Sequence, residues 1–352
     1  MQENQNNQNQ EIEVDENHLI QIRKDKLKEL QEQGKNPFEI TKYNRTNSAG
    51  EIKANYEKFE QKDVSVAGRI IAKRIMGKAS FCTILDSDEK IQSYVSINDL
   101  GEESYKAFKT FDIGDIIGIT GFVFKTRTEE ISVHAKEVVL LSKSLRPLPE
   151  KFHGLKDVDL RYRQRYVDLI MNPEVKETFK KRSQIISEIR NILDEKGYLE
   201  VETPILNTIS GGATARPFIA HHNAYDMDVF LRISPELTLK KLIIGGFNNV
   251  YEVARDFRNE GIDKNHLQDF TMVEGYSAYW NYEDNMKFLK EMVIYIFNKL
   301  FDGNLIVRIG DKDIDFGGEW EIVSFRDLVL RDCGIDIDKF ETAESLLAEI
   351  RA

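Results

Sequence analysis

The segment from Tyr251 to Tyr276 holds the side chains with the clearest potential for chemistry. Residues 250–257 and 269–276 alternate large apolar with polar residues, and a polar loop, 259–268, joins them, so the pattern predicts a β-hairpin. This hairpin would gather a cation, two carboxylates, a phenol and an aromatic ring near one surface: Arg258, Glu260, Glu274, Tyr276 and Phe270. Such a set suits a ligand that carries phosphate, purine and amine groups. Taken alone, the same residues also fit an exposed hairpin with surface ion pairs.

The composition predicts a globular protein with more than one domain. A chain of 352 residues with 41% hydrophobic residues can bury two cores. The net charge of −11 argues against nonspecific coating of nucleic acid, although local basic patches remain compatible with RNA binding. Residues 1–10 do not read as a signal peptide, and no apolar run is long enough to span a membrane. Cys82 and Cys333 cannot form a disulfide framework, so we expect a cytoplasmic protein.

Changes in composition divide the chain into five segments. Residues 1–15 are polar and low in complexity, which predicts a disordered tail. Residues 16–59 begin with a helix, 16–33, that Gly34 ends, and continue as a connection. A small β domain at 60–145 is followed by a proline-containing linker at 146–160, and a second domain occupies 161–352.

The β domain has the element order of an OB-fold. Strands are predicted at 64–73, 80–86, 91–96, 115–125 and 131–141, with a helix at 98–110 between the third and the fourth. OB-folds bind single-stranded nucleic acid on the face of strands 2 and 3, where alternation places Phe81 and Gln92. An exposed Phe stacks on a base and a Gln amide reads a base edge, while Arg74 belongs to a basic cluster in the first hairpin. The pattern is equally compatible with Phe81 in the core.

The second domain reads as α+β. Helices are predicted at 161–171, 174–196, 235–244 and 282–301, and strand-like segments at 198–204, 218–220 and 228–233 precede the hairpin. Antiparallel strands with flanking helices give this class. The domain has neither a GxGxxG fingerprint nor a GxxxxGK[ST] loop, so nucleotide binding here cannot use those two routes.

Several motifs resemble one family when they are taken together. Phe257-Arg258-Asn259-Glu260 is similar to the FRxE core of motif 2 in class II aminoacyl-tRNA synthetases. Almost the whole chain after its tail resembles the bacterial type of lysyl-tRNA synthetase. The similar segments are VAGRI (66–70), MGKASF (76–81), LRPLPEKFHGLKD (145–157), RYRQRYVDL (161–169), GGATARPF (211–218), RISPELTLK (232–240) and VARDFRNEG (253–261). Their order and spacing are more specific than any single match.

The resemblance implies a lysine–tRNA ligase that uses ATP and Mg²⁺. Lysine would be activated to lysyl-adenylate and then transferred to tRNA(Lys). The resemblance assigns ATP binding to Arg258, Glu260, His266 and Phe270, with Arg258 in the catalytic role. It assigns lysine binding to Gly212, Glu236, Arg258, Glu274 and Tyr276. Anticodon binding falls to Phe81, Gln92 and Arg74, and the family is expected to be a homodimer.

The sequence departs from the family in two places. The motif 2 loop reads His266-Leu267-Gln268-Asp269-Phe270-Thr271, where the family usually has His-Asn-Pro-Glu-Phe-Thr. Motif 3 and the acidic strand that holds magnesium are absent, so no metal ligand is expected in this chain. We therefore expect a C-terminally truncated form that represents the first two-thirds of a synthetase and is impaired in activation.

Two other functions stay open. One is an aspartyl- or asparaginyl-type class II synthetase, which has the same domain layout, although Glu274 beside Tyr276 would repel an acidic side chain. The other is a tRNA-binding fragment without catalysis. A synthetase-like enzyme that lysylates a translation factor is disfavoured because that family lacks the OB domain.

Overall fold

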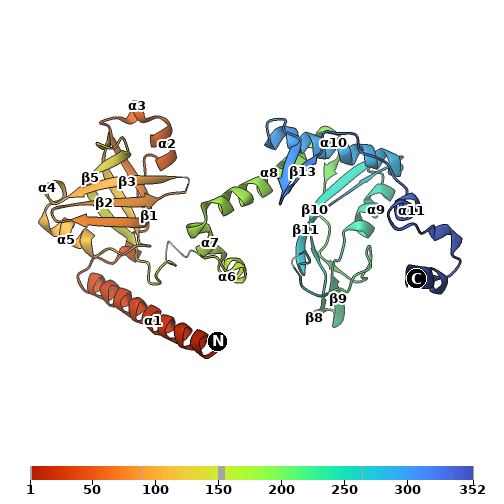
Figure 1. Cartoon of the computed structure of the whole chain (residues 1–352), viewed down its shortest axis with the longest axis horizontal. Helices are drawn as coiled ribbons and strands as arrows, with labels where there is room; N and C mark the ends of the chain where they lie inside the picture. Colours follow the sequence, from red (N-terminus) through yellow and green to blue (C-terminus); the bar gives the residue numbers. More distant parts are fainter. Residues whose placement is uncertain (1, 88, 150–154, 264, 352) are drawn as a thin grey trace. The chain divides into compact units, whose positions relative to one another are not determined.

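The computed structural model describes residues 2–87, 89–149, 155–263 and 265–351 (Figure 1). The chain divides into two compact units, Met1–Pro173 and Glu174–Ala352, which are treated separately below. None of the helices formed by the described residues is long and apolar enough to cross a membrane.

Five strands close the barrel of the first unit. They are β1 (Asp63–Met76), β2 (Ala79–Leu85), β3 (Lys90–Ser96), β4 (Ile116–Lys125) and β5 (Ile131–Ser142), in the order β1-β2-β3-β5-β4. The β3–β5 pair is parallel and the other pairs are antiparallel. Helices α4 (Ile97–Leu100) and α5 (Glu102–Thr110) lie between β3 and β4 in the chain and replace the one predicted helix, because Gly101 interrupts it with a φ of 81°. The barrel confirms the predicted OB-fold.

Strict alternation along the strands builds the barrel core. In β2 and β3, Cys82, Ile84, Ile91, Ser93 and Val95 are wholly buried, while the residues that alternate with them are partly exposed. Gly121 lies at a β-bulge, where a side chain would put its Cβ 1.9 Å from the backbone oxygen of His134. Only glycine permits this close approach, so the sharp coiling of β4 against β5 depends on it.

The N-terminal helix is longer than the sequence predicts. Helix α1 runs from Gln2 to Glu32 and so includes most of the segment 1–15, for which the sequence predicts a disordered tail. Neither glycine nor proline occurs before Gly34, and Gln and Glu favour the helix more than Asn does. Arg23 of this helix donates hydrogen bonds to the backbone oxygens of Ile113, Ser144 and Arg146 at 3.0–3.1 Å.

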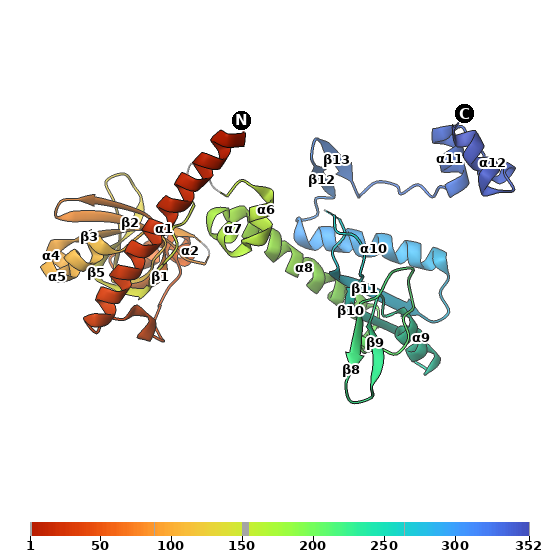
Figure 2. The same cartoon turned by 90° about the horizontal axis from the view of Figure 1, so that it is seen from below.

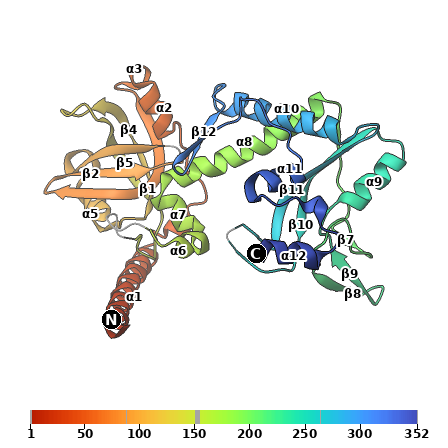
Figure 3. The same cartoon turned by 45° about the vertical axis from the view of Figure 1, so that its right-hand side comes forward.

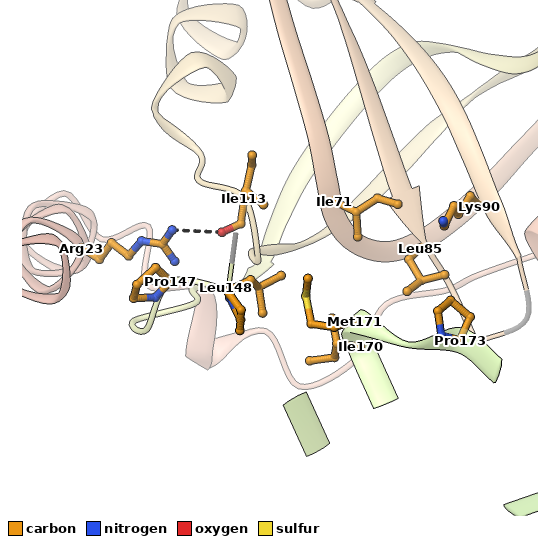
Figure 4. A pocket seen from close by; sticks show the side chains of 11 residues that line it. Arg23, Ile71, Leu85, Lys90, Ile113, Pro147, Leu148, Ile170, Met171 and Pro173 are labelled. Atoms are coloured by element: carbon orange, nitrogen blue, oxygen red, sulfur yellow. Dashed lines mark hydrogen bonds between the residues drawn. The ribbon is translucent and has the colours of Figure 1, made fainter. Parts of the chain in front are cut away.

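An apolar pocket of about 320 Å³ lies within the first unit (Figure 4). Its walls come from β1, β2, the segment before residue 150 and helix α7 (Arg165–Met171), and include Ile71, Leu85, Leu148, Ile170 and Met171. Residues 150–154 of the predicted linker lie outside the described residues. Side chains of the barrel and of α7, the second helix after the linker, thus line the same pocket.

The predicted helix 161–171 forms two helices, α6 (Val158–Arg163) and α7, separated at Gln164. Wholly buried Asp168 accepts hydrogen bonds from Arg161 Nε (2.7 Å), Arg165 and Asn172 (2.6 Å). Although burial opposes ionisation, the hydrogen bonds from Asn172 and Arg161 lower the pKa of Asp168. Two arginines of the RYRQRYVDL motif therefore hold these helices together. The first unit also contains η1 (Pro37–Glu39), α2 (Ala49–Ala54) and α3 (Tyr56–Phe59).

The second unit is α+β, as predicted. Its main sheet has the order β11-β10-β6, formed by β6 (Leu199–Glu200), β10 (Asn249–Phe257) and β11 (Asp269–Ser277). A second sheet, β7-β9-β8, contains β7 (Leu206–Asn207), β8 (Ile219–His222) and β9 (Met227–Leu231), and β12 (Ile306–Ile309) pairs with β13 (Lys312–Asp315). The predicted strand at 198–204 is shortened to the two residues of β6.

In the part of the chain that the structure describes, three helices pack against the main sheet. Side chains from α8 (Pro173–Glu195) and α10 (Tyr282–Leu300) pack with Tyr251, Val253 and Val273 on one face, and Figure 2 shows α10 along β10 and β11. Figure 3 shows α9 (Glu236–Ile244) beside β10 and β11. Asn281 begins α10 with a reciprocal capping box with Asp284. The unit ends with α11 (Phe325–Cys333), η2 (Ile337–Lys339) and α12 (Ala343–Arg351).

A buried ion-pair network secures the first unit where β5 ends. Lys143, with only 2% of its side chain exposed, lies 2.9 Å from wholly buried Asp115 and 2.5 Å from Asp112. Lys26 of α1 reaches Asp112 at 2.7 Å. The network therefore ties α1 to both ends of the α5–β4 loop.

We predict that Lys143→Met destabilises the barrel by roughly 3–5 kcal/mol, because two carboxylates lose their buried counter-charge while the apolar volume is kept. Hydrogen exchange of β1, β4 and β5 measures the change. The control is Lys136→Met, which removes the cation of an exposed pair with Asp63 and should cost less than about 1 kcal/mol. Equal effects of the two substitutions would contradict the prediction.

Candidate functional site

The register of the β10–β11 hairpin assigns each side chain to a face. The antiparallel pairs include Val250 with Tyr276, Glu252 with Glu274, and Asp256 with Phe270. The backbone amide of Arg258 donates to the oxygen of Gln268 at 2.8 Å, which extends the pairing by one residue. Alternation then places Arg258, Phe270, Glu274 and Tyr276 on the face opposite the one that packs against α8 and α10.

At the open end of the hairpin, a pocket of about 470 Å³ contains the four residues to which ATP binding was assigned: Arg258, Glu260, His266 and Phe270. The Arg258 guanidinium lies 5.2 Å from the centroid of the Phe270 ring, a cation–π contact. Its Nε and Nη2 also lie 3.4 Å from the backbone oxygen of Ile233. A guanidinium and an aromatic face are thus held together at the pocket wall.

The loop of this hairpin is organised by Asp263. Its carboxylate accepts hydrogen bonds from the backbone amides of Asn265 (2.6 Å) and His266 (2.9 Å) and lies 2.7 Å from His266 Nδ1. The backbone amide of Asn265, followed by the His266 ring, lowers the pKa of Asp263. Glu260 accepts from the backbone amide of Arg216 at 3.3 Å, which links the loop to the GGATARPF segment.

Residues to which lysine binding was assigned gather around Ser234. The Ser234 hydroxyl donates to Glu274 Oε1 at 2.8 Å, and the Tyr276 hydroxyl donates to Glu274 Oε2 at 3.2 Å. The backbone amide of Glu236 donates to Ser234 Oγ at 3.0 Å. Burial, followed by the charges of Glu274 and Glu236, raises the pKa of Tyr276, so its phenol stays protonated as a donor.

Gly212 approaches the same cluster through its backbone. Its φ is 93°, and an added Cβ would lie 3.1 Å from both the Cβ of Glu236 and the hydroxyl of Ser234. A side chain at this position would be strained and crowded. The structure therefore brings Gly212, Glu236, Glu274 and Tyr276 together.

Beneath these residues lies a buried polar cluster that the sequence did not reveal. Arg232, 5% exposed, donates to Glu252 Oε1 at 2.6 Å, to the backbone oxygen of Thr203 at 3.1 Å and to the backbone oxygen of Arg255 at 3.0 Å. The period-2 pattern of β10 could have indicated Glu252 and Asp256, since both share the face of Arg258. Their partner Arg232 lies outside the hairpin and carries no such pattern.

Asp256 is wholly buried and lies 3.3 Å from Arg232 Nε, yet neither carboxylate oxygen has a hydrogen-bond partner among the described residues. Burial raises the pKa of Asp256 to about 6, although Arg232 acts in the opposite direction and Glu274 adds to the increase. The carboxyl therefore titrates close to neutral pH.

In the first unit, a separate pocket of about 190 Å³ contains all three residues to which anticodon binding was assigned. Arg74 is paired with Phe81 across β1 and β2, and Thr83 with Gln92 across β2 and β3. The Phe81 ring is partly exposed, 5.4 Å from the ring of Tyr94, whereas its neighbour Cys82 points into the core. Phe81 is therefore on the outer face of the barrel. Within the described ranges, no group of three or more His, Cys, Asp or Glu residues could hold a metal ion.

Comparison with known families identifies the class. The family model of class II tRNA synthetases (D, K and N) matches residues 157–345, and that of the OB-fold nucleic acid binding domain matches residues 64–141. The chain therefore belongs to the class II tRNA synthetases.

Similar curated proteins indicate which family within this class the chain belongs to. A lysine–tRNA ligase from Clostridium tetani is 53% identical over 342 residues, which cover 97% of this chain and 68% of the relative. Lysine–tRNA ligases from Clostridium novyi and Clostridium botulinum (strain Hall) are each 54% identical, over 93% and 92% of this chain and 64% of each relative. Within the class, the chain is a member of the lysine–tRNA ligase family. It spans about two-thirds of the length of these relatives.

The titration of Asp256 gives a testable pH dependence. The folded state keeps its proton up to about pH 6, whereas the unfolded chain releases it near pH 3.9, so burial of this group lowers the free energy of unfolding as the pH rises through that window. Asn carries no charge. Asp256→Asn should therefore gain stability relative to the wild type above pH 6, by at most about 3 kcal/mol, and lose that advantage below pH 4.

Urea denaturation followed by Trp280 and Trp320 fluorescence at pH 4, 5, 6 and 7 would measure this difference. Asp311→Asn is the control, since Asp311 is exposed in the β12–β13 turn. A constant difference between Asp256→Asn and wild type across this range would rule out the assigned titration.

Proposed function

We propose that the protein activates lysine with ATP and transfers it to tRNA(Lys) in the cytoplasm. The observation that carries this proposal is the shared hairpin face, where Arg258 over Phe270 lies on the same side as Glu274 with its two hydrogen bonds. The end of this face that carries Arg258 and Phe270 suits a nucleotide, and the end that carries Glu274 suits an ammonium group. Family membership supports the same reaction.

Arg258 is suited to hold the two groups that react, the lysine carboxylate and the α-phosphate. A planar guanidinium can bond two oxygens at once, so it would bridge the lysine carboxylate and the α-phosphate. A carboxylate oxygen of lysine attacks the α-phosphorus, and the bond from that phosphorus to the pyrophosphate oxygen breaks. This step depends on in-line positioning and on neutralised charge rather than on covalent help from the protein.

The remaining pocket residues would hold the nucleotide. Phe270 would stack on adenine, and Glu260 would accept from the adenine amine. His266, bonded through Nδ1 to Asp263, can present Nε2 to the distal phosphates. The family generally uses Mg²⁺ with ATP, and a bound ion would neutralise phosphate charge, but no residue of this chain is assigned to it.

Lysine specificity would come from Glu274. Its carboxylate is held on both oxygens by Ser234 and Tyr276, which positions a negative charge for the ε-ammonium. Glu236 and the backbone of Gly212 would receive the α-ammonium. An acidic or amide side chain would leave the Glu274 charge without a counter-ion, which disfavours aspartate and asparagine.

We predict that Arg258→Ala weakens ATP binding and Glu274→Gln weakens lysine binding, each by roughly 10- to 100-fold, because each removes hydrogen bonds to a charged group worth about 1.5–3 kcal/mol. Calorimetric titration of the chain measures both. Arg255→Ala is the matched control, since Arg255 is on the same strand, is exposed and points to the opposite face.

Lysine-dependent exchange of pyrophosphate into ATP tests the chemistry, and binding distinguishes the alternatives. Tighter binding of aspartate or asparagine than of lysine would favour the other synthetases of the class. Binding of tRNA with no binding of ATP or lysine would favour a tRNA-binding module without catalysis.

The outer face of the barrel is the proposed anticodon site. Phe81 supplies a ring for stacking, Gln92 an amide for a base edge, and Arg74 a cation for phosphate. Phe81→Ala should weaken binding of the tRNA(Lys) anticodon stem-loop by about 1–3 kcal/mol, measured by fluorescence anisotropy at fixed salt. Phe38→Ala, which removes a half-exposed ring from η1, should have no effect. Equal losses from both variants would exclude a specific stack.

We also propose that the protein forms a homodimer through α8 and β6. Among the described residues, strand β6 pairs with β10 on one side only, and apolar side chains of α8 and β6 are exposed, namely Phe179 (43%), Ile185 (37%) and Leu199 (47%). Such an edge is stabilised when a partner covers it.

Light scattering at micromolar concentration should give a dimer mass that Leu199→Glu reduces. Leu347→Glu, at an equally exposed position of α12, should leave the dimer intact. A monomer at all concentrations would refute the proposal.

A further inference from the structure

Gln92, which faces the proposed anticodon site, has a buried partner on the neighbouring strand. It is in register with Ser132 where β3 and β5 run parallel. Both side chains lie on the outer face of the barrel, yet Ser132 is wholly buried. The single proton of the Ser132 hydroxyl is shared between two acceptors, Gln92 Oε1 and the backbone oxygen of Glu130, each at 3.2 Å.

The hydrogen bond from Ser132 determines which end of the Gln92 amide is presented to a ligand. A glutamine amide has an oxygen that accepts and a nitrogen that donates. Because Ser132 engages the oxygen, the nitrogen with its two hydrogens stays available for the pocket that Phe81 and Arg74 share. Without the hydroxyl, the amide could turn over and present either end at little cost.

A fixed donor discriminates between the two pyrimidines of RNA. Uracil carries a carbonyl oxygen at position 4, whereas cytosine carries an amino group there. The Gln92 amide hydrogens pair with the first and oppose the second, since two donors then face each other. Stacking on Phe81 and phosphate contact with Arg74 do not distinguish these bases, so the difference would come from the amide.

We propose that Ser132 is a positioning residue that fixes the Gln92 amide so that the outer face of the barrel selects uracil over cytosine. The proposal rests on the anticodon-binding function proposed above and gives that site its base preference. It assigns selectivity to a serine that is itself out of reach of the RNA.

The experiment uses the whole chain and RNA hairpins whose seven-nucleotide loop carries three consecutive uridines, with each uridine replaced in turn by cytidine. Fluorescence anisotropy at one salt concentration gives the ratio of dissociation constants for cytidine against uridine at each position. The wild type should show a ratio of about 10 or more at one position, the size of one base-edge contact. Ser132→Ala should reduce that ratio to below about 3 while still binding the uridine hairpin.

Ser93→Ala is the matched control. Ser93 is adjacent to Gln92 and wholly buried on the inner side of the barrel, and its hydroxyl has no hydrogen-bond partner among the described residues. Its loss should leave the ratio unchanged, whereas a general loosening of the barrel would alter both variants alike. Circular dichroism and thermal unfolding of each variant report the state of the fold.

The outcomes separate this inference from the proposed function. If the wild type prefers uridine and Ser132→Ala keeps the full ratio, the positioning role is wrong while anticodon binding stands. Binding of all hairpins with equal affinity, or a preference for cytidine, also overturns the role of Ser132 alone. Failure of the wild type to bind any hairpin would overturn the anticodon function together with this inference.

Discussion

The buried guanidinium of Arg232 connects the interior of the second unit to its proposed binding surface. Its donors reach Glu252, Thr203 and the backbone of Arg255, so strand β10 and the segment that follows β6 depend on one planar group. The two residues that follow it supply the backbone oxygen that Arg258 contacts and the hydroxyl that holds Glu274. Removing this cation would leave two buried carboxylates without a counter-charge and would release the segment that both proposed subsites share.

The two units have the same arrangement of side chains at their proposed sites. In each, a cation lies beside an aromatic ring: Arg258 with Phe270, and Arg74 with Phe81. In each, a serine hydroxyl holds the polar side chain that would confer selectivity, Ser234 for Glu274 and Ser132 for Gln92. Under the proposed functions, affinity and selectivity would depend on different residues, so that each could change without loss of the other.

The alternation of apolar and polar residues predicted most of the strands, because each strand has one face in a core and one face outside it. The five barrel strands and the hairpin follow alternation, which places Phe81, Gln92, Arg258 and Glu274 on their observed faces. The split of the predicted helices at Gly101 and Gln164 was missed, as was the extension of α1 to Gln2. Those boundaries depend on single-residue conformations and on the balance of weak propensities.

The buried polar contacts could not be predicted from the sequence. Thr203 and Glu252 are 49 residues apart, and Gln92 and Ser132 are 40 apart, so no local periodicity connects them. Family resemblance assigned the residues that are proposed to face the ligands, because their motifs are contiguous. It did not indicate the residues that hold those side chains in place, which become visible only when the strands are paired.

The backbone of Gly212 limits how this site can evolve. A larger residue there would be strained at a φ of 93° and crowded against Glu236 and Ser234, so glycine backbone is favoured as the wall beside them. A peptide group offers the same hydrogen bonds whatever amino acid is bound, whereas the side chains on β11 can be exchanged one at a time without moving that wall. Changes in side-chain preference are therefore open to single substitutions on the strand. Under the proposed function, recognition of the group common to all amino acids would rest on a position where replacement of glycine is strained and crowded.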